Sequence, residues 1–192
     1  NLNLYGISGS YSGTTILDNA GIADSSAIGF ALQFAQNAYV QFNTASIYKP
    51  EVTSIDIFYP KQASAITYEV SIDGSLFGSF TTLTGSSGAG KASLSGFTNA
   101  AHTIRITQTS TGTGYLFEAN LKTSNPGVYV HQLGNGGLSN AQMAQLSSHK
   151  YLWSDMQPDL VAIRVGANSL GASPADVNAR INVQTAITNI KT

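Results

Sequence analysis

The sequence of 192 residues contains no cysteine, and only 10% of its residues are charged, against roughly 25% in an average soluble domain. The absence of cysteine excludes disulfides, thiolate metal ligands and a cysteine nucleophile. A net charge of −1, with no basic stripe, predicts no affinity for nucleic acid or for an anionic membrane. No apolar run approaches the ~20 residues that span a bilayer.

Glycine, serine, threonine and asparagine take the place of the missing charges. A polar but uncharged surface is typical of extracellular, viral and sugar-binding β proteins, so we expect the protein outside the cell or on a virion. No signal peptide and no initiator methionine stand at Asn1. The chain is therefore expected to begin inside a longer polypeptide.

Residues 1–125 have the pattern of a β domain. Asp73-Gly74 separates "YEVSI" from "SLFGSF" and predicts a two-residue hairpin turn, in which both residues take φ > 0. The segment 84–93 is rich in small polar residues and predicts a connector. Strands of this length at close spacing predict a jelly-roll-like antiparallel β-sandwich. Short apolar or alternating runs predict strands over 38–42, 54–59, 66–72, 102–109 and 114–121.

Residues 126–192 follow a different pattern, which alternates strands and helices. "GVYVHQL" predicts a strand, and Ser139 caps a helix after it. A buried strand follows over 159–166, and Ser173 caps a second helix. The β-α-β-α order implies parallel strands joined by a right-handed crossover. Two strands are too little sheet to stand alone, so this part is expected to belong to a larger α/β domain.

Glycine-rich turns follow both predicted strands of this second part, at 133–139 and 165–171. Ligands of open α/β sheets bind outside the carboxyl ends of the strands. Glycine N–H groups and the Asn168 amide could therefore form an oxyanion hole, which stabilises a tetrahedral intermediate of acyl transfer. Alternatively, these glycines only make tight turns and Asn168 satisfies local backbone.

The motif "GVYVHQLGNGGLSNAQ", followed by "PDLVAIRVGANS", resembles the second and third conserved blocks of the SGNH (GDSL-type) esterase family. The resemblance implies a flavodoxin-like hydrolase fold over 126–192 and assigns the oxyanion hole to Gly137 and Asn168. Some members insert a jelly-roll, carbohydrate-binding-like domain before these blocks, as in phage tail-fibre proteins and bacterial polysaccharide or peptidoglycan O-acetylesterases. Residues 1–125 resemble such an insert.

The catalytic residues of that family are missing from this chain. No Gly-Asp-Ser occurs, and "GISGS" (6–10) lacks both the nucleophile frame and a preceding strand. None of the seven aspartates has a histidine three residues later. A serine hydroxyl needs an adjacent base to become nucleophilic, so the chain as it stands cannot start the covalent mechanism. The missing parts either lie in a longer parent protein, or the hydrolase part has lost activity and serves as a scaffold.

Other polar and aromatic residues carry no motif for a cofactor or a metal. His102 is expected to be half-exposed at a strand start, and His131 and His149 have structural explanations. The aspartates form no calcium loop. Trp153 is expected to pack a helix, and Arg164 is an unexplained charge in an apolar strand. Five tyrosines could stack on a sugar, although the core is the commoner place for each: Tyr39, Tyr48, Tyr59, Tyr68 and Tyr115.

Three functional hypotheses follow. The first is a portion of a carbohydrate esterase that removes acyl groups from a cell-surface polysaccharide, without a cofactor. The second is a non-catalytic carbohydrate- or receptor-binding virion protein with a degenerate hydrolase scaffold. The third is a structural fibre or capsid segment, in which homo-oligomers build a larger assembly.

Overall fold

The computed structural model describes part of the chain. The chain divides into two compact units, one formed by 1–23 with 30–129 and the other by 24–29 with 130–192. Every described strand lies in the first unit. The described residues are 2–4, 7–18, 30–46, 51–86, 88–126, 159–160, 181, 184–185 and 187–188.

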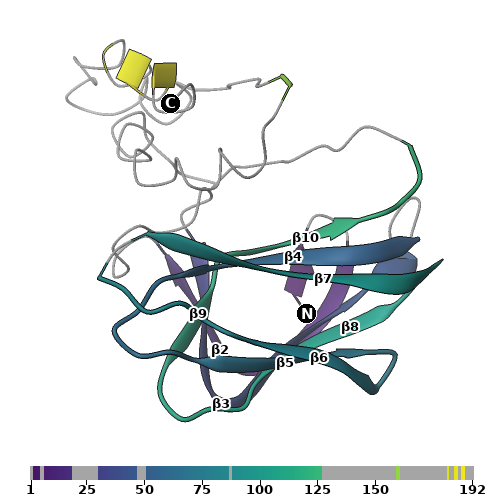
Figure 1. Ribbon diagram of the computed structural model, residues 1–192, viewed down its shortest axis with the longest axis horizontal. Coiled ribbons are helices and arrows are strands. Elements are labelled where there is room, and N and C mark those ends of the chain that lie inside the picture. The colour runs from purple at the N-terminus through teal and green to yellow at the C-terminus, as the bar shows by residue number, and fades with distance from the viewer. Residues whose placement is uncertain are drawn as a thin grey trace. The chain divides into compact units, whose positions relative to one another are not determined.

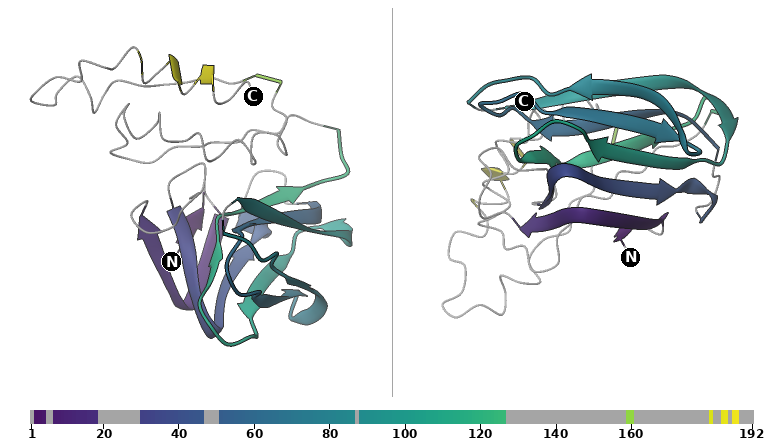
Figure 2. Two further views of the ribbon diagram at one scale, coloured as in Figure 1. Left: turned by 60° about the vertical axis from the view of Figure 1, so that its left-hand side comes forward. Right: turned by 90° about the horizontal axis from the view of Figure 1, so that it is seen from below.

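The described part of the first unit is a sandwich of two antiparallel sheets. Sheet A has the strand order β1-β2-β3-β8-β5-β6, with β9 also paired to β3, and sheet B has the order β10-β4-β7. The sheets form two layers (Figure 1), and the strands of sheet A run side by side when seen from below (Figure 2). The strands are β1 (Leu2–Leu4), β2 (Ile7–Asp18), β3 (Phe30–Asn43), β4 (Val52–Pro60), β5 (Thr67–Ile72), β6 (Ser75–Thr81), β7 (Ala89–Ala100), β8 (Thr103–Gln108), β9 (Gly114–Leu116) and β10 (Glu118–Lys122), with the 3-10 helix η1 (Thr44–Ser46) after β3.

The chain alternates between the two sheets, as in jelly rolls. It passes from sheet A to sheet B between β3 and β4, returns at β5, crosses again at β7 and returns at β8. The predicted jelly-roll-like β-sandwich is therefore confirmed at the level of a two-sheet antiparallel β fold.

The sandwich core forms because apolar residues alternate along the strands and point between the sheets. Strand β5 shows this pattern most simply, with Tyr68, Val70 and Ile72 buried and their neighbours half-exposed. Burying an aliphatic or aromatic side chain of this size stabilises the fold by about 1.5–3 kcal/mol. Further core residues come from both sheets: Phe34, Val40, Phe42, Ile55, Ile57, Tyr59, Ile104, Ile106 and Leu116.

The strand predicted over 114–121 is in fact two strands in different sheets. β9 pairs with β3 in sheet A, whereas β10 pairs with β4 in sheet B. Phe117 lies between them, and its backbone N–H donates to the carbonyl of Phe58 at 2.8 Å. Leu116 and Phe117 at this break are both buried, so the sequence shows no polar interruption there.

The connector predicted over 84–93 is wrong in its second half, since β7 begins at Ala89. Gly90, which falls within the predicted connector, lies inside the strand and against the Tyr59 ring. A Cβ at Gly90 would overlap that ring. The glycine permits close approach of a buried aromatic rather than a turn.

The segment at 6–10 also differs from expectation. β1 precedes β2 and pairs with it in an antiparallel register, so Ile7–Asp18 is a long strand of sheet A. β2 then pairs along most of β3. The serines of "GISGS" therefore belong to a strand and not to the sharp strand-to-helix turn that exposes a hydrolase nucleophile.

The flavodoxin-like SGNH part predicted over 126–192 falls almost wholly outside the described residues and stays a prediction. The described residues of this range with helical backbone are Ile181, Gln184, Thr185, Ile187 and Thr188. The Thr188 hydroxyl donates to the Gln184 carbonyl at 2.9 Å, which is an i to i−4 contact. Within the described part of the chain, no helix is long and apolar enough to cross a membrane.

Candidate functional site

The outer face of sheet A carries rows of polar side chains across three neighbouring strands. In β8, in β5 and in residues 38–43 of β3 the odd-numbered residues point away from the core, because their even-numbered neighbours are buried. The register places Gln41 of β3 opposite Arg105 of β8, and Arg105 opposite Ser71 of β5. A flat polar row of an amide, a guanidinium and a hydroxyl thus crosses the centre of the sheet.

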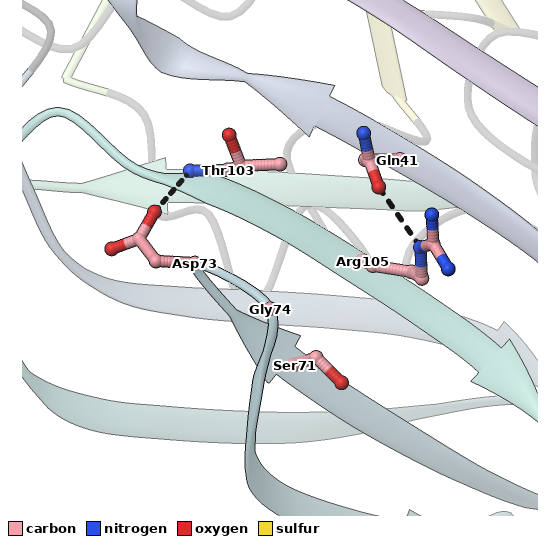
Figure 3. Close-up of a pocket in the computed structure, with 6 residues that line it drawn as sticks. All are labelled: Gln41, Ser71, Asp73, Gly74, Thr103 and Arg105. Atoms are coloured by element: carbon pink, nitrogen blue, oxygen red, sulfur yellow. Dashed lines mark hydrogen bonds between the residues drawn. The ribbon is translucent and has the colours of Figure 1, made fainter.

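Arg105 is held in place by two neighbours on β3. Its Nε donates to Oε1 of Gln41 at 2.9 Å, and its Cζ lies 4.2 Å from the centroid of the Tyr39 ring. The stack fixes the plane of the guanidinium, and the hydrogen bond fixes its rotation within that plane. The two terminal amino groups of Arg105 make no hydrogen bond to any described residue, and Figure 3 shows the single bond from Nε to Gln41.

A hollow of about 470 Å³ lies on this face beside the turn between β5 and β6. Figure 3 shows its lining, in which every side chain carries a hydrogen-bonding group. One position, Gly74, contributes backbone alone. The lining residues are Gln41, Ser71, Asp73, Gly74, Thr103 and Arg105.

The rim of the hollow is the predicted Asp73-Gly74 turn, which is confirmed. Both residues have positive φ, 51° for Asp73 and 83° for Gly74, as a two-residue hairpin requires. The Asp73 N–H donates to the Thr103 carbonyl at 2.8 Å. In return, the Thr103 N–H donates to Oδ1 of Asp73 at 2.8 Å, the bond that Figure 3 draws. The turn is thereby attached to the start of β8.

His102 supports this turn from inside the protein. Its Nδ1 lies 2.7 Å from Oδ2 of Asp73, and its Nε2 lies 2.8 Å from the Thr98 carbonyl oxygen. Its backbone exchanges two hydrogen bonds with Thr44, in which the His102 N–H donates to the threonine hydroxyl at 2.8 Å and the Thr44 N–H donates to the His102 carbonyl at 2.9 Å. Only 5% of His102 is exposed, so the expectation of a half-exposed side chain is wrong.

The two ring contacts of His102 define its charge. A carboxylate oxygen and a carbonyl oxygen only accept hydrogen bonds, so the protonated ring, in which both nitrogens donate, is the form that satisfies both contacts. Burial by itself lowers the pKa of His102, but the hydrogen bonds to Asp73 and Thr98 outweigh it and raise the pKa above 6.5. The backbone N–H of Thr103 and the His102 ring hold the pKa of Asp73 below 3.8.

The side chains that line the hollow are hydrogen-bonding groups. Both nitrogens of His102 are already committed as donors, so its ring has no lone pair to act as a base. No group of three histidine, aspartate or glutamate side chains in the described part of the chain could hold a metal ion. The chemistry that this face supports is hydrogen bonding to a ligand.

Of the site residues predicted from the sequence, the oxyanion-hole candidates Gly137 and Asn168 lie outside the described residues. Tyr48, His131, His149, Trp153 and Arg164 do so as well. Tyr59 and Tyr68 are core residues, which confirms the commoner expectation for them. Tyr39 lies on the outer face of sheet A, where it contacts Arg105.

Sequence reasoning missed the lining residues Gln41, Ser71, Thr103 and Arg105. A local signal existed, because "YVQFN", "TYEVSI" and "TIRITQ" alternate polar and apolar residues. That alternation predicts which residues face outward, but not which of these three strands become neighbours.

Comparison with known proteins adds a structural likeness only. No family model matches the chain, and no curated protein does, so the resemblance of 126–170 to the SGNH family stays a prediction. A family 35 carbohydrate-binding module from Clostridium thermocellum is 7% identical, covers 60% of this chain and 92% of its own, and has a TM-score of 0.46. A CBM35 from Paenibacillus barcinonensis is 15% identical over 64% of this chain and 96% of its own, with a TM-score of 0.44. CsCBM6-3 from Clostridium stercorarium, solved in complex with cellobiose, is 15% identical over 61% of this chain and 87% of its own, with a TM-score of 0.43. At these identities and TM-scores the likeness assigns neither a family nor a ligand to this chain.

Proposed function

We propose that the protein binds carbohydrate on the outer face of sheet A, in the hollow beside the Asp73-Gly74 turn. The observation that carries the proposal is the row formed by Gln41, Arg105 and Ser71, whose hydrogen-bonding groups line a hollow of about 470 Å³. That volume suits a ligand of one or a few sugar rings.

The lining favours a ligand that is rich in hydroxyl groups. An apolar ligand would remove water from the amide, hydroxyl and guanidinium groups without replacing their hydrogen bonds, which is unfavourable. A sugar hydroxyl both donates and accepts, so it matches the Gln41 amide and the Ser71 hydroxyl alike. The Tyr39 ring, with Arg105 over it, adds a flat surface at one side of the row.

The net charge of −1 argues against a nucleic acid as the ligand, since binding to phosphates depends on clusters of lysine and arginine. We assign binding to this face, because every side chain that lines the hollow carries a hydrogen-bonding group. A cell-surface polysaccharide is the proposed partner, and the proposed location is extracellular or on a virion.

The test is binding of the full 192-residue chain to a panel of neutral and acidic oligosaccharides, with affinities measured by calorimetry. Gln41→Ala and Ser71→Ala each remove one side-chain partner in the row, and each should weaken binding by about threefold to tenfold. Ser95→Ala, an exposed serine on β7 in sheet B, is the matched control and should leave the affinity unchanged. Binding that ignores both sheet A variants, or no binding to any sugar, would refute the proposal.

An esterase is the second candidate, supported by the resemblance of residues 126–170 to two SGNH blocks. In this case the sandwich would hold a polysaccharide for deacetylation by a hydrolase domain. The experiment measures acetate release from an acetylated polysaccharide by the 192-residue chain and by the whole product of its gene. Asn168→Ala should lower any activity of the whole product by about 100-fold or more, because it removes an oxyanion donor. Activity unchanged by Asn168→Ala would contradict this assignment.

A further inference from the structure

We infer that the sugar bound in this hollow is acidic, and that the guanidinium of Arg105 binds its carboxylate or sulfate group. This inference rests on the proposed function, because it names the chemical class of the ligand for the same face. Three features of the described residues carry it: the unused donors of Arg105, the cancelled charge of Asp73 and the position of Glu69.

Arg105 presents donors that no described residue uses. Its Nε is occupied by Gln41 and one side of its plane faces the Tyr39 ring, but its terminal amino groups remain without a partner among the described residues. A guanidinium matches a carboxylate or a sulfate with two parallel N–H···O bonds, and such charged bonds are roughly twice as strong as neutral ones. Because Gln41 and Tyr39 already hold the Arg105 side chain in place, ligand binding would cost it little further conformational entropy.

The carboxylate of Asp73 does not cancel the charge of Arg105, because it is already neutralised. Oδ1 of Asp73 accepts from the Thr103 N–H, and Oδ2 accepts from the charged ring of His102. Asp73 and the protonated ring of His102 together are neutral, so the lining taken together with His102 behind it carries one net positive charge, that of Arg105. The hollow therefore attracts an anion.

Glu69 sets the direction in which an anion can lie. It is the other carboxylate on this face of β5, one row away from Ser71 and opposite Thr107. Glu69 and Arg105 form no ion pair within the described part of the chain. An acidic ligand would place its charged group at Arg105 and its neutral hydroxyls toward Glu69, since like charges repel.

The experiment compares a galacturonic acid trisaccharide, neutral galactotriose and sulfated galactotriose, each titrated into the full chain. The expected result is that at least one acidic sugar binds about tenfold more tightly than galactotriose, and less tightly as salt is added. Arg105→Gln keeps an amide donor but removes the charge, so the preference should disappear while galactotriose still binds. Glu69→Gln is the matched variant, because it removes a negative charge from the same face. It should strengthen binding of the acidic sugar.

The outcomes separate this inference from the proposed function. If galactotriose binds as tightly as both acidic sugars, or if Glu69→Gln leaves their affinity unchanged, the acidic ligand is ruled out and carbohydrate binding stands. If no sugar binds, both proposals fail. In that case a titration with sodium sulfate, followed by the NMR signal of the Arg105 Nε–H group, would show whether Arg105 binds a simple anion only. Tighter binding of the carboxylate or of the sulfate alone supports the inference and identifies the group.

Discussion

The Nδ1 atom of His102 lies 2.7 Å from Oδ2 of Asp73, and this pair joins the sandwich interior to the rim of the polar hollow. Only 4% of the histidine side chain is exposed, against 55% of the aspartate side chain. Asp73 belongs to the turn between β5 and β6, while His102 ends the connection from β7 to β8 and is also bonded to Thr44 of η1. His102 therefore connects three segments that are distant in the sequence, through its ring to Asp73 and through its backbone to Thr44.

This pair predicts a maximum of stability at mildly acidic pH. The pKa of His102 is raised, so its contribution to the free energy of unfolding is complete below about pH 6.5 and is lost as the pH rises through the folded-state pKa. The pKa of Asp73 is lowered, so its contribution is complete above about pH 3.8 and is lost as the pH falls through the folded-state pKa. The pair should therefore stabilise the fold most between pH 3.8 and 6.5.

NMR titration of the His102 ring measures the pKa of His102 directly and should give a midpoint above pH 6.5. Thermal unfolding of His102→Gln should show a lower melting temperature than the wild type at pH 6, with a smaller difference at pH 9. A His102 ring that titrates below pH 6.5 would contradict the assignment of an imidazolium.

Glu118 predicts a second pH-dependent effect, on sheet B. Burial raises the pKa of this carboxyl from 4.5 to about 7, against a smaller opposing effect of its hydrogen bond to Asn120. The folded state therefore favours the neutral acid, and stability is lost as the pH rises from 4.5 through 7. Glu118→Gln removes the ionisation and should stabilise the protein by about 1–3 kcal/mol above pH 7.

Urea unfolding at pH 4 and at pH 8 tests this prediction, because the gain from Glu118→Gln should be small at pH 4 and appear at pH 8. Glu69→Gln on the outer face of sheet A serves as the control, and it should change stability by less than about 0.5 kcal/mol. Equal gains at both pH values would show that the effect comes from packing and not from ionisation.

Tyr68 and Tyr59 are a matched pair for measuring how much a buried hydroxyl contributes to the free energy of unfolding. Both rings are buried and both stack on Phe80, but the Tyr59 hydroxyl is hydrogen-bonded to the Leu83 backbone, whereas the Tyr68 hydroxyl has no partner among the described residues. Tyr59→Phe should lower the free energy of unfolding by about 0.5–1.5 kcal/mol. Tyr68→Phe should be neutral or stabilising, because it removes an unsatisfied polar group. Equal losses in urea unfolding for the two variants would disprove this difference.

A side chain at Gly114 would clash with its neighbours, and shortening Tyr68 should relieve part of that clash. A Cβ at this position would overlap the Tyr68 hydroxyl and the Gln108 side-chain oxygen, both of which are buried. Gly114→Ala should therefore destabilise the protein by about 1–3 kcal/mol. Adding Tyr68→Phe should recover part of this loss, because the two sites share one contact.

The control for this variant is Gly78→Ala, whose Cβ would meet only the end of the Leu94 side chain, at 3.0 Å. That flexible end can move, so the loss in free energy of unfolding should be smaller than for Gly114→Ala. A double variant no more stable than Gly114→Ala alone would show that the Gln108 or Ile66 side chain causes the strain.

Many strands of the sandwich could be predicted from short segments of the sequence. The alternation in "TYEVSI" and "TIRITQ" predicts strands with one buried face, and Asp73-Gly74 predicts the hairpin that joins β5 to β6. Short sequence patterns predicted the wrong local structure where contacts with residues distant in the sequence determine it. Gly90 is a strand residue because the Tyr59 ring lies against it, and the break at Phe117 reflects the transfer of the chain from sheet A to sheet B.

The sequence by itself determined which side chains face outward, because side chains alternate along a strand with a period of two. The tertiary structure decided which of them meet. Gln41 and Arg105 are 64 residues apart, and His102 and Asp73 are 29 apart. These pairs form only when β3, β8 and β5 lie side by side, and that order comes from burying the apolar faces of two sheets against each other, a non-local effect that no short segment encodes.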